Sequence, residues 1–355
     1  MAQDAHANTQ QPATLLSYPF KALARGQTLE VASGVHWIRM PLPFALNHIN
    51  LWAIDDGAGW AIVDTGTYSD DNVQVWRTLF AQATDRRPIT RVFVTHMHPD
   101  HVGMAGWLTR KLGIRLWMTR LEYLNCRVLA SESGHEATPD AQLFYLQAGW
   151  SAPAIESYHR LFGVFGAHIH ALPDSYRRLP DGEDLRIGAH AWRVIVGNGH
   201  SPEHACLYCP ELGVLISGDQ VLPRISSNIS VYPSEPDADP MRDWLDSLQK
   251  LKREVPDDVL VLPSHNEPFR GLHGRLAQLA LDHERTFERL KHALQQPRRA
   301  VELSEALFGR AISEDDIPLL HMATGEAMAC LNHLMYRGEV LRVLADDGVH
   351  RYFLS

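Results

Sequence analysis

Four side chains that bind metals stand within six residues of one another, in the segment VFVTHMHPDHVG. His96 and His98 come at the end of a predicted strand, where residues two apart project to the same side, so we expect both imidazoles to hold one ion. Pro99 predicts a turn, and Asp100 and His101 follow at the start of a predicted helix, facing a second ion. With 20 histidines in the chain, such a string arises by chance in only about a few per thousand sequences. The segment therefore predicts metal binding.

Three further ligands each follow an apolar strand: His200 after WRVIVGNG, Asp219 after VLISG and His265 after VLVLPS. Residues beyond strand ends gather along one edge of a sheet, where α/β folds build their sites. Together the seven side chains suit two divalent ions. The expected grouping is His96, His98 and His200 on one ion, Asp100, His101 and His265 on the other, and Asp219 bridging. Such ligands favour zinc, with iron or manganese as alternatives.

The elements that must carry these ligands alternate along the chain. After a polar tail the sequence predicts strands at 35–41, 48–55 and 59–64, a helix at about 69–83, a strand at 89–95 and a helix at 101–113. Strands resume at 184–197, 204–209, 214–218 and 259–264, with a helix over PMRDWLDSLQKLKREV between the last two. This alternation predicts a layered α/β domain.

Two regions depart from that alternation. Residues 119–166 are mostly helical and rich in aromatic residues, which predicts an insertion or lid. Beyond residue 270, three amphipathic helices are followed by two β-type runs around Asp347-Gly348, a strong hairpin turn. That order is typical of a winged helix. We therefore predict a flexible tail at 1–20, a catalytic domain at 21–270 and a winged-helix-like domain at 271–355.

Composition excludes several classes of protein. The chain has 355 residues and a net charge of −9, and it lacks both a signal peptide and an apolar run long enough to span a membrane, so we expect a cytoplasmic protein. Its four cysteines are too scattered for a disulfide framework, and the pair Cys206 and Cys209 is expected to lie on a plain strand. The acidic balance disfavours nucleic acid and anionic membranes as partners.

Five motifs, in this order, make the chain resemble the metallo-β-lactamase superfamily: VDTG (63–66), HMHPDH (96–101), GNGHSPEHACLY (197–208), SGDQ (217–220) and PSH (263–265). The resemblance covers about residues 30–270 and implies an αββα sandwich with the metals between the edges of two sheets. It carries the same seven ligands and implies that Asp64 supports the metal loop from behind. The nearest likeness is to lactamase-β-like hydrolases with a C-terminal winged-helix-like domain. That group is related to glyoxalase II, lactonases and RNase Z, but the glyoxalase II elements after Asp219 and around His265 are absent here.

A two-metal site predicts hydrolysis. The ions lower the pKa of a shared water, and the resulting bridging hydroxide attacks a polarised carbonyl while Asp100 orients it and relays a proton. We expect a small-molecule thioester, ester or lactone as substrate, because the aromatic insertion suits an apolar acyl group. Candidate substrate contacts are Arg224, Ser226 and Asn228 after the bridging ligand, and Tyr123, Tyr145 and Tyr158 in the insertion.

Two alternatives remain open at this point. The same metal pair also cleaves phosphodiesters, so a phosphodiesterase or ribonuclease is the second enzymatic reading, disfavoured by the lack of a dense Lys/Arg run. A metal-sensing winged-helix regulator is the reading from another class. Residues 271–355 carry 10 Lys and Arg against 12 Asp and Glu, and the expected recognition segment TGEAMACLNHLMYRG is mostly apolar. We therefore expect this region to pack on its neighbour or on a second subunit of a homodimer rather than on DNA.

Overall fold

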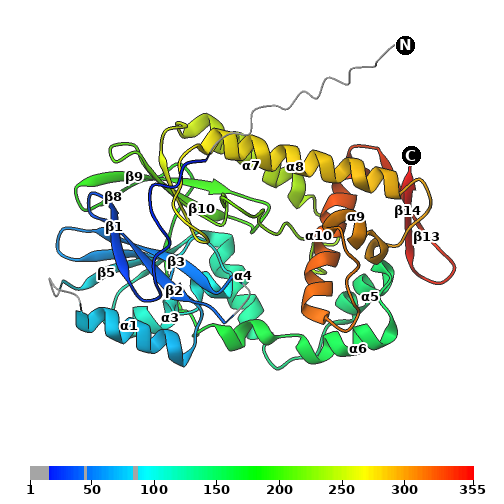
Figure 1. The fold of residues 1–355 in the computed structure, drawn as a ribbon. Helices are drawn as coiled ribbons and strands as arrows, with labels where there is room; N and C mark the ends of the chain where they lie inside the picture. The colour runs from blue at the N-terminus through cyan, green and yellow to red at the C-terminus, as the bar shows by residue number, and fades with distance from the viewer. Residues whose placement is uncertain (1–15, 44–45, 83–86) are drawn as a thin grey trace, which may run out of the picture.

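The computed structural model describes residues 16–43, 46–82 and 87–355. The predicted tail at 1–20 lies mostly outside these residues. Two β-sheets form the body of the predicted catalytic domain, called the catalytic body from this point, and helices cover their outer faces (Figure 1). The chain therefore has the mixed α/β, αββα architecture that the sequence predicts. Among the described residues, no helix combines the length and apolarity needed to cross a bilayer.

The first sheet has seven strands in sequential order, antiparallel from β1 to β4 and parallel from β4 to β7. Its strands are β1 (Thr28–Ala32), β2 (Val35–Pro41), β3 (His48–Asp55), β4 (Trp60–Val63), β5 (Ile89–Phe93), β6 (Leu116–Met118) and β7 (Arg177–Arg178). Its outer face packs on α1 (Asp70–Gln82), α2 (Pro99–Val102) and α3 (Ala105–Leu112). The parallel pairing places the ends of β4 and β5 at the same edge.

The second sheet has five strands in the order β12, β11, β10, β9, β8, and only its β11–β12 pair is parallel. Its strands are β8 (Asp184–Ile187), β9 (His190–Gly197), β10 (His204–Cys209), β11 (Val214–Gly218) and β12 (Leu260–Pro263). Trp37, Trp52 and Trp192 lie in the core between the two sheets. Cys206 and Cys209 are buried on β10 in two different cores, which fits ordinary strand residues.

The outer face of the second sheet packs on α7 (Pro240–Glu254) and α8 (Leu272–Ala293), and one continuous core runs from there into the C-terminal helices. This region contains η2 (Ala300–Leu303), α9 (Ser304–Phe308), α10 (Ile317–Tyr336) and the hairpin of β13 (Val340–Leu344) and β14 (His350–Leu354). Most of α10 is buried, from Ala323 to Leu334. The expected recognition helix is thus a core helix, and its apolar face packs on this same chain.

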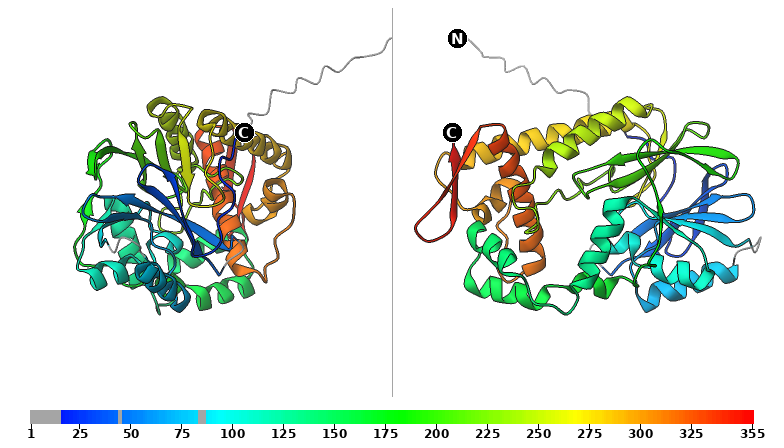
Figure 2. Two further views of the ribbon diagram at one scale, coloured as in Figure 1. Left: turned by 60° about the vertical axis from the view of Figure 1, so that its left-hand side comes forward. Right: turned by 180° about the vertical axis from the view of Figure 1, so that it is seen from behind.

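The segment 119–166 is helical, as predicted, and contains α4 (Arg120–Ser131), α5 (Pro139–Ala148), α6 (Ala152–Leu161) and the start of η1 (Val164–His168). Helix α4 packs on the catalytic body, whereas α5 and α6 lie beside α10 (Figure 2). Tyr145 and Trp150 join the same core as α10. The insertion therefore connects the catalytic body to the C-terminal helices.

Candidate metal centre

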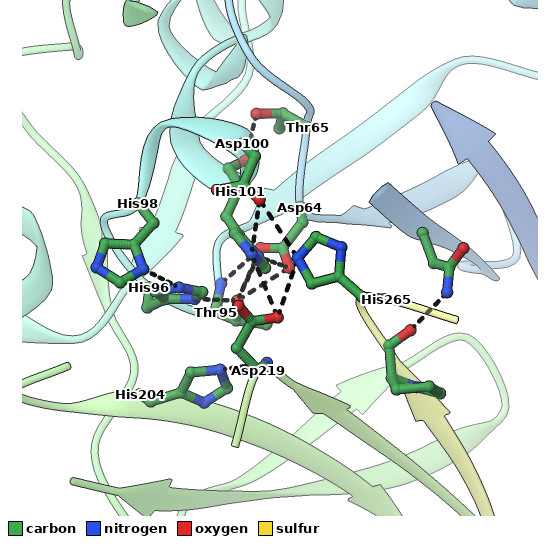
Figure 3. A network of polar contacts seen from close by, with 12 residues as sticks. Asp64, Thr65, Thr95, His96, His98, Asp100, His101, His204, Asp219 and His265 are labelled. Atoms are coloured by element: carbon green, nitrogen blue, oxygen red, sulfur yellow. Dashed lines mark hydrogen bonds and ion pairs between the residues drawn. The ribbon is translucent and has the colours of Figure 1, made fainter. Parts of the chain in front are cut away.

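All seven predicted ligands follow strand ends at one edge of the two sheets. His96 and His98 lie between β5 and α2, Asp100 and His101 lie in the first turn of α2, and His200, Asp219 and His265 follow β9, β11 and β12. Figure 3 shows six of these side chains pointing toward one another. Three groups of possible ligand atoms lie within 4.8 Å of one another: His96, His98 and His200; His96, His101 and Asp219; and Asp100, His101 and His265.

The carboxylate of Asp219 stands between the two expected ligand groups. Its Oδ1 lies 3.5 Å from His101 Nε2 and 3.6 Å from His265 Nε2, while its Oδ2 lies 3.5 Å from His200 Nε2. Asp100 Oδ2 lies 3.4 Å from His265 Nε2. Ligands about 2.0–2.2 Å from a tetrahedral ion are separated by roughly 3.3–3.6 Å, so these spacings suit a shared ion on each side of Asp219.

Three ligand histidines are oriented by oxygen atoms behind them. The Nδ1 atoms of His101, His200 and His265 donate to Asp64 Oδ2 at 2.8 Å, Asn228 O at 2.8 Å and His48 O at 3.0 Å. Since a carboxylate or carbonyl oxygen accepts only, Nδ1 of each ring carries a proton, and Nε2 is the nitrogen that faces the centre.

Several atoms at this centre are buried without a hydrogen-bond partner among the described residues. They include the Nε2 atoms of His101 and His200 and the Oδ1 atom of Asp219. Buried polar atoms are nearly always hydrogen-bonded, and leaving one unpaired costs about 1–3 kcal/mol. Divalent ions would satisfy these atoms, so the donor set fits two metals.

The protonation states of His96, His98 and Asp219 also suit metal binding. Burial lowers the pKa of His98 to about 3, and burial with the neighbouring His101 and His98 lowers the pKa of His96 well below its usual value. Burial by itself would raise the pKa of Asp219, but His265 and His101 outweigh it and hold that pKa well below the usual range. Neutral imidazoles and an ionised carboxylate are the forms that bind metals.

Asp64 supports the centre from the end of β4, as the resemblance implies. Its carboxylate accepts hydrogen bonds from Thr95 N at 2.8 Å, Thr95 Oγ1 and His101 Nδ1. Its backbone φ is +61°, a left-handed conformation that Asp tolerates better than most residues. This conformation turns the chain at the strand end, and the carboxylate ties the loop after β5 to the ligand His101.

Sequence reasoning missed two residues that support Asp219. His204, on β10, accepts a hydrogen bond from Asp219 N at 3.0 Å through its Nε2 atom. A Cβ atom on Gly218, whose φ is +53°, would lie 2.4 Å from that same nitrogen, so only glycine fits before Asp219. The sequence signal was weak, because a histidine inside a buried strand usually has only a packing role.

Glu122, on α4, was missed as well. It is fully buried, and its two carboxylate oxygens accept hydrogen bonds from Met97 N and Glu203 N, each at 2.8 Å. These donors belong to the two loops that carry His98 and His200. One buried carboxylate therefore joins both ligand loops, although a lone Glu in a helix gives no such signal in the sequence.

The predicted substrate contacts are dispersed. Tyr123 donates to Pro173 O and stacks on Tyr176, and Arg224 pairs with Glu267 at 3.2 Å. Tyr145 hydrogen-bonds to His321 on α10, and Tyr158 packs against Tyr145. Ser226 Oγ lies 3.4 Å from Ser227 O. The backbone carbonyl of Asn228 accepts from His200 Nδ1. The structure thus brings Asn228 into direct contact with a candidate ligand, His200, and engages Tyr123 with Pro173 and Tyr176.

Comparisons with known proteins agree with this architecture. Residues 46–265 match the family described as "Metallo-beta-lactamase superfamily", and residues 287–355 match "Metallo-beta-lactamase-like, C-terminal domain". A solved beta-lactamase domain protein from Burkholderia ambifaria is 42% identical, with a TM-score of 0.87 over 96% of this chain and 98% of that one. A metallo-beta-lactamase family protein from Thermus thermophilus is 26% identical, with a TM-score of 0.76 over 92% of this chain and all of the other.

Among curated proteins, the lactamase-like protein notP from Aspergillus sp. (strain MF297-2) is 22% identical over 311 residues, which is 86% of this chain and 77% of that protein. The similarity therefore extends beyond the catalytic body into the C-terminal region. Both the two-sheet body and the helices that follow it have counterparts in known proteins.

Proposed function

The chain belongs to the metallo-beta-lactamase superfamily and is a hydrolase of that superfamily; from this premise we propose that it cleaves a thioester, ester or lactone with two divalent metals, zinc being the first choice. The observation that carries the proposal is the donor set, in which the two oxygens of Asp219 face different ligand groups. His96, His98, His200 and Asp219 would hold one ion, and Asp100, His101, His265 and Asp219 the other. When bound, such a pair activates a water and polarises the carbonyl under attack.

The protein's own residues supply orientation and proton transfer. Asp100 is the more accessible of the two carboxylates, with 21% of its side chain exposed against 10% for Asp219. Burial opposes ionisation of Asp100, but His101 and His265 outweigh it and lower its pKa to about 2. The carboxylate is therefore ionised, and we assign Asp100 to accept a hydrogen bond from the attacking water, to orient it and to relay its proton to the leaving group.

The segment after Asp219 favours a neutral, partly apolar substrate over a phosphodiester. Ile225 is 37% exposed, and the cation of Arg224 is engaged by Glu267. Recognition of a phosphate backbone depends on clustered cationic side chains. An acyl group on a thiol or alcohol leaving group suits this surface better.

The test is a hydrolysis panel on the full chain, with metal content measured for each sample. Acyl-CoA, acyl-glutathione, a lactone and a phosphodiester are compared before chelation, after chelation and after zinc is restored. We expect metal-dependent turnover of at least one carbonyl substrate. Turnover of the phosphodiester alone, or carbonyl hydrolysis that survives complete removal of metal, would overturn the proposal.

A further inference from the structure

The segment 219–239, which begins with the bridging ligand Asp219, is held by the C-terminal helices. Val231 N donates to Gly325 O on α10 at 3.0 Å, and Asn332 on α10 donates to Pro236 O and Ala238 O. Figures 1 and 2 show the strand-to-helix connection running from the catalytic body to α10. The metal centre and the C-terminal region therefore share one continuous segment.

Arg275, on α8, anchors the same segment nearer the centre. Its guanidinium donates to Leu222 O at 2.6 Å and to Ile225 O at 2.8 Å, and the side chain is 9% exposed. Two charge-assisted hydrogen bonds from a buried arginine restrict the backbone strongly. The chain leading from Asp219 to Asn228 is thus restrained on one side by α8.

Asn228 connects this segment to a metal ligand. Its backbone carbonyl accepts from His200 Nδ1 at 2.8 Å, while its side chain is held from two sides. Asn228 Nδ2 donates to Glu326 Oε2 on α10 at 3.0 Å, and Asn228 Oδ1 accepts from Ser230 Oγ at 2.5 Å. Both ends of the amide are engaged, so the residue has a defined orientation.

Glu326 lies next to Gly325, a point of close approach between α10 and the segment. A Cβ atom on the neighbouring Gly325 would lie 2.8 Å from Ser230 Oγ and 3.1 Å from Val231 O, so glycine permits the approach. Burial raises the pKa of Glu326 to about 7, although the hydrogen bond from Asn228 opposes this shift. Removing a carboxyl group from water costs free energy unless the group has a specific hydrogen-bond partner.

We propose that Glu326 is a positioning residue of the metal centre, acting through Asn228 to fix the carbonyl that orients His200. The inference rests on the proposed metal centre and extends it to a residue some 60 positions beyond the last ligand. Under this proposal the C-terminal region completes the metal centre. Its contribution is the orientation of one imidazole, and Glu326 itself does not contact substrate.

The physical consequence concerns metal affinity. Partners that hold a ligand histidine by its second nitrogen typically contribute 10- to 100-fold in affinity. Glu326 acts one residue further away, so we expect about a 10-fold loss for E326A. E326Q retains an amide oxygen that accepts from Asn228 Nδ2, and we expect it to stay within about twofold of the unaltered chain.

The experiment titrates Co²⁺ into the metal-free full chain against a chromophoric chelator and records the visible spectrum of the bound ion. The variants are E326A, E326Q and N228A, with E339A as matched control. Glu339 pairs with Lys291 and Arg337 in the C-terminal region, away from the segment 219–239. We expect weaker Co²⁺ binding and an altered spectrum for E326A and N228A, and unchanged behaviour for E339A.

A double variant tests whether the two residues act as one unit. If Glu326 acts through Asn228, E326A/N228A loses no more affinity than either single variant. Unaltered Co²⁺ affinity and spectrum in N228A and E326A would overturn the proposal, as would equal losses in E326A and E339A. If E326A does not fold, the Co²⁺ affinity and spectrum of N228A test the proposal, because N228A removes the same hydrogen bond by deleting its donor.

The Co²⁺ readout uses no substrate, so it is separate from the hydrolysis panel. If no carbonyl substrate is turned over but E326A still weakens Co²⁺ binding, the proposed function fails and the positioning role of Glu326 stands. If carbonyl substrates are turned over and Co²⁺ binding is insensitive to E326A and N228A, the proposed function stands and the positioning role of Glu326 fails.

Discussion

Buried histidines occur both at the edge of the two sheets and among the C-terminal helices, but their surroundings differ. At the sheet edge, His101 and His200 use Nδ1 for a hydrogen bond and leave Nε2 facing the carboxylate of Asp219. Among the helices, His333 pairs with Asp239 and His321 pairs with Tyr145, with no second ligand group converging on them in the described structure. Convergence of imidazole nitrogens on shared carboxylates, rather than burial, therefore distinguishes the candidate metal ligands from the core histidines.

Removing one aspartate from each region tests this difference between the two kinds of histidine. D219A takes away the carboxylate that both ligand groups face, so we expect loss of bound metal and a fall in turnover of roughly 1,000-fold or more. D239A removes the partner of His333 and the cap of α7, and we expect lower stability with metal content and turnover per folded molecule preserved. Metal analysis and steady-state kinetics measure both. Full activity of metal-free D219A would contradict the assignment.

Glu122 tests whether the ligand loops need a common anchor. In E122Q one carboxylate oxygen is replaced by an amide that faces a backbone N–H, at Met97 or Glu203. We expect destabilisation of about 2–3 kcal/mol and roughly 10-fold weaker metal binding. Chemical denaturation and chelator competition measure these two effects. E136Q, at an exposed position, provides the matched control. Equal stability and metal affinity of E122Q and E136Q would show that Glu122 does not anchor the ligand loops.

The pH dependence of stability tests a buried histidine among the C-terminal helices. Burial lowers the pKa of His283 on α8 to about 4, against about 6.5 in an unfolded chain. Between these values the unfolded state binds more protons, so the stabilisation is complete above pH 6.5 and is lost as pH falls toward 4. We expect metal-free H283L to lose about 1–2 kcal/mol less than the metal-free unaltered chain between pH 7 and pH 5. Denaturant melts at both values provide the measurement, and parallel losses would show that His283 does not titrate in this way.

The smallest expected effect concerns DNA. Because the apolar side of α10 is buried against its own chain, the C-terminal region lacks an exposed recognition helix among the described residues. We expect the fluorescence anisotropy of a labelled duplex to stay constant up to about 10 µM protein at physiological salt. Salt-dependent binding in the low micromolar range would instead favour the regulatory reading.

Local sequence accounted for much of the architecture. The HMHPDH string and the apolar runs before His200, Asp219 and His265 were enough to predict strand ends and a shared edge, because strands end where their apolar alternation stops. The three helices and the hairpin after residue 270 could also be predicted from the sequence. The residues that support the ligands were harder to predict from the sequence. Glu122 and Glu326 each lie in a helix, where an isolated acidic residue is normally solvated, and only packing shows which of them are buried.

The sequence predicted which seven side chains are candidate ligands, because His and Asp directly after apolar strands can be recognised from local pattern. Tertiary structure decided how those ligands are held. Asn228 was predicted to contact substrate, and the structure adds that its carbonyl accepts from His200 and its amide donates to Glu326, 98 residues later in the chain. Such contacts depend on the relative placement of two packed regions, and no local pattern of residues encodes that distance in space.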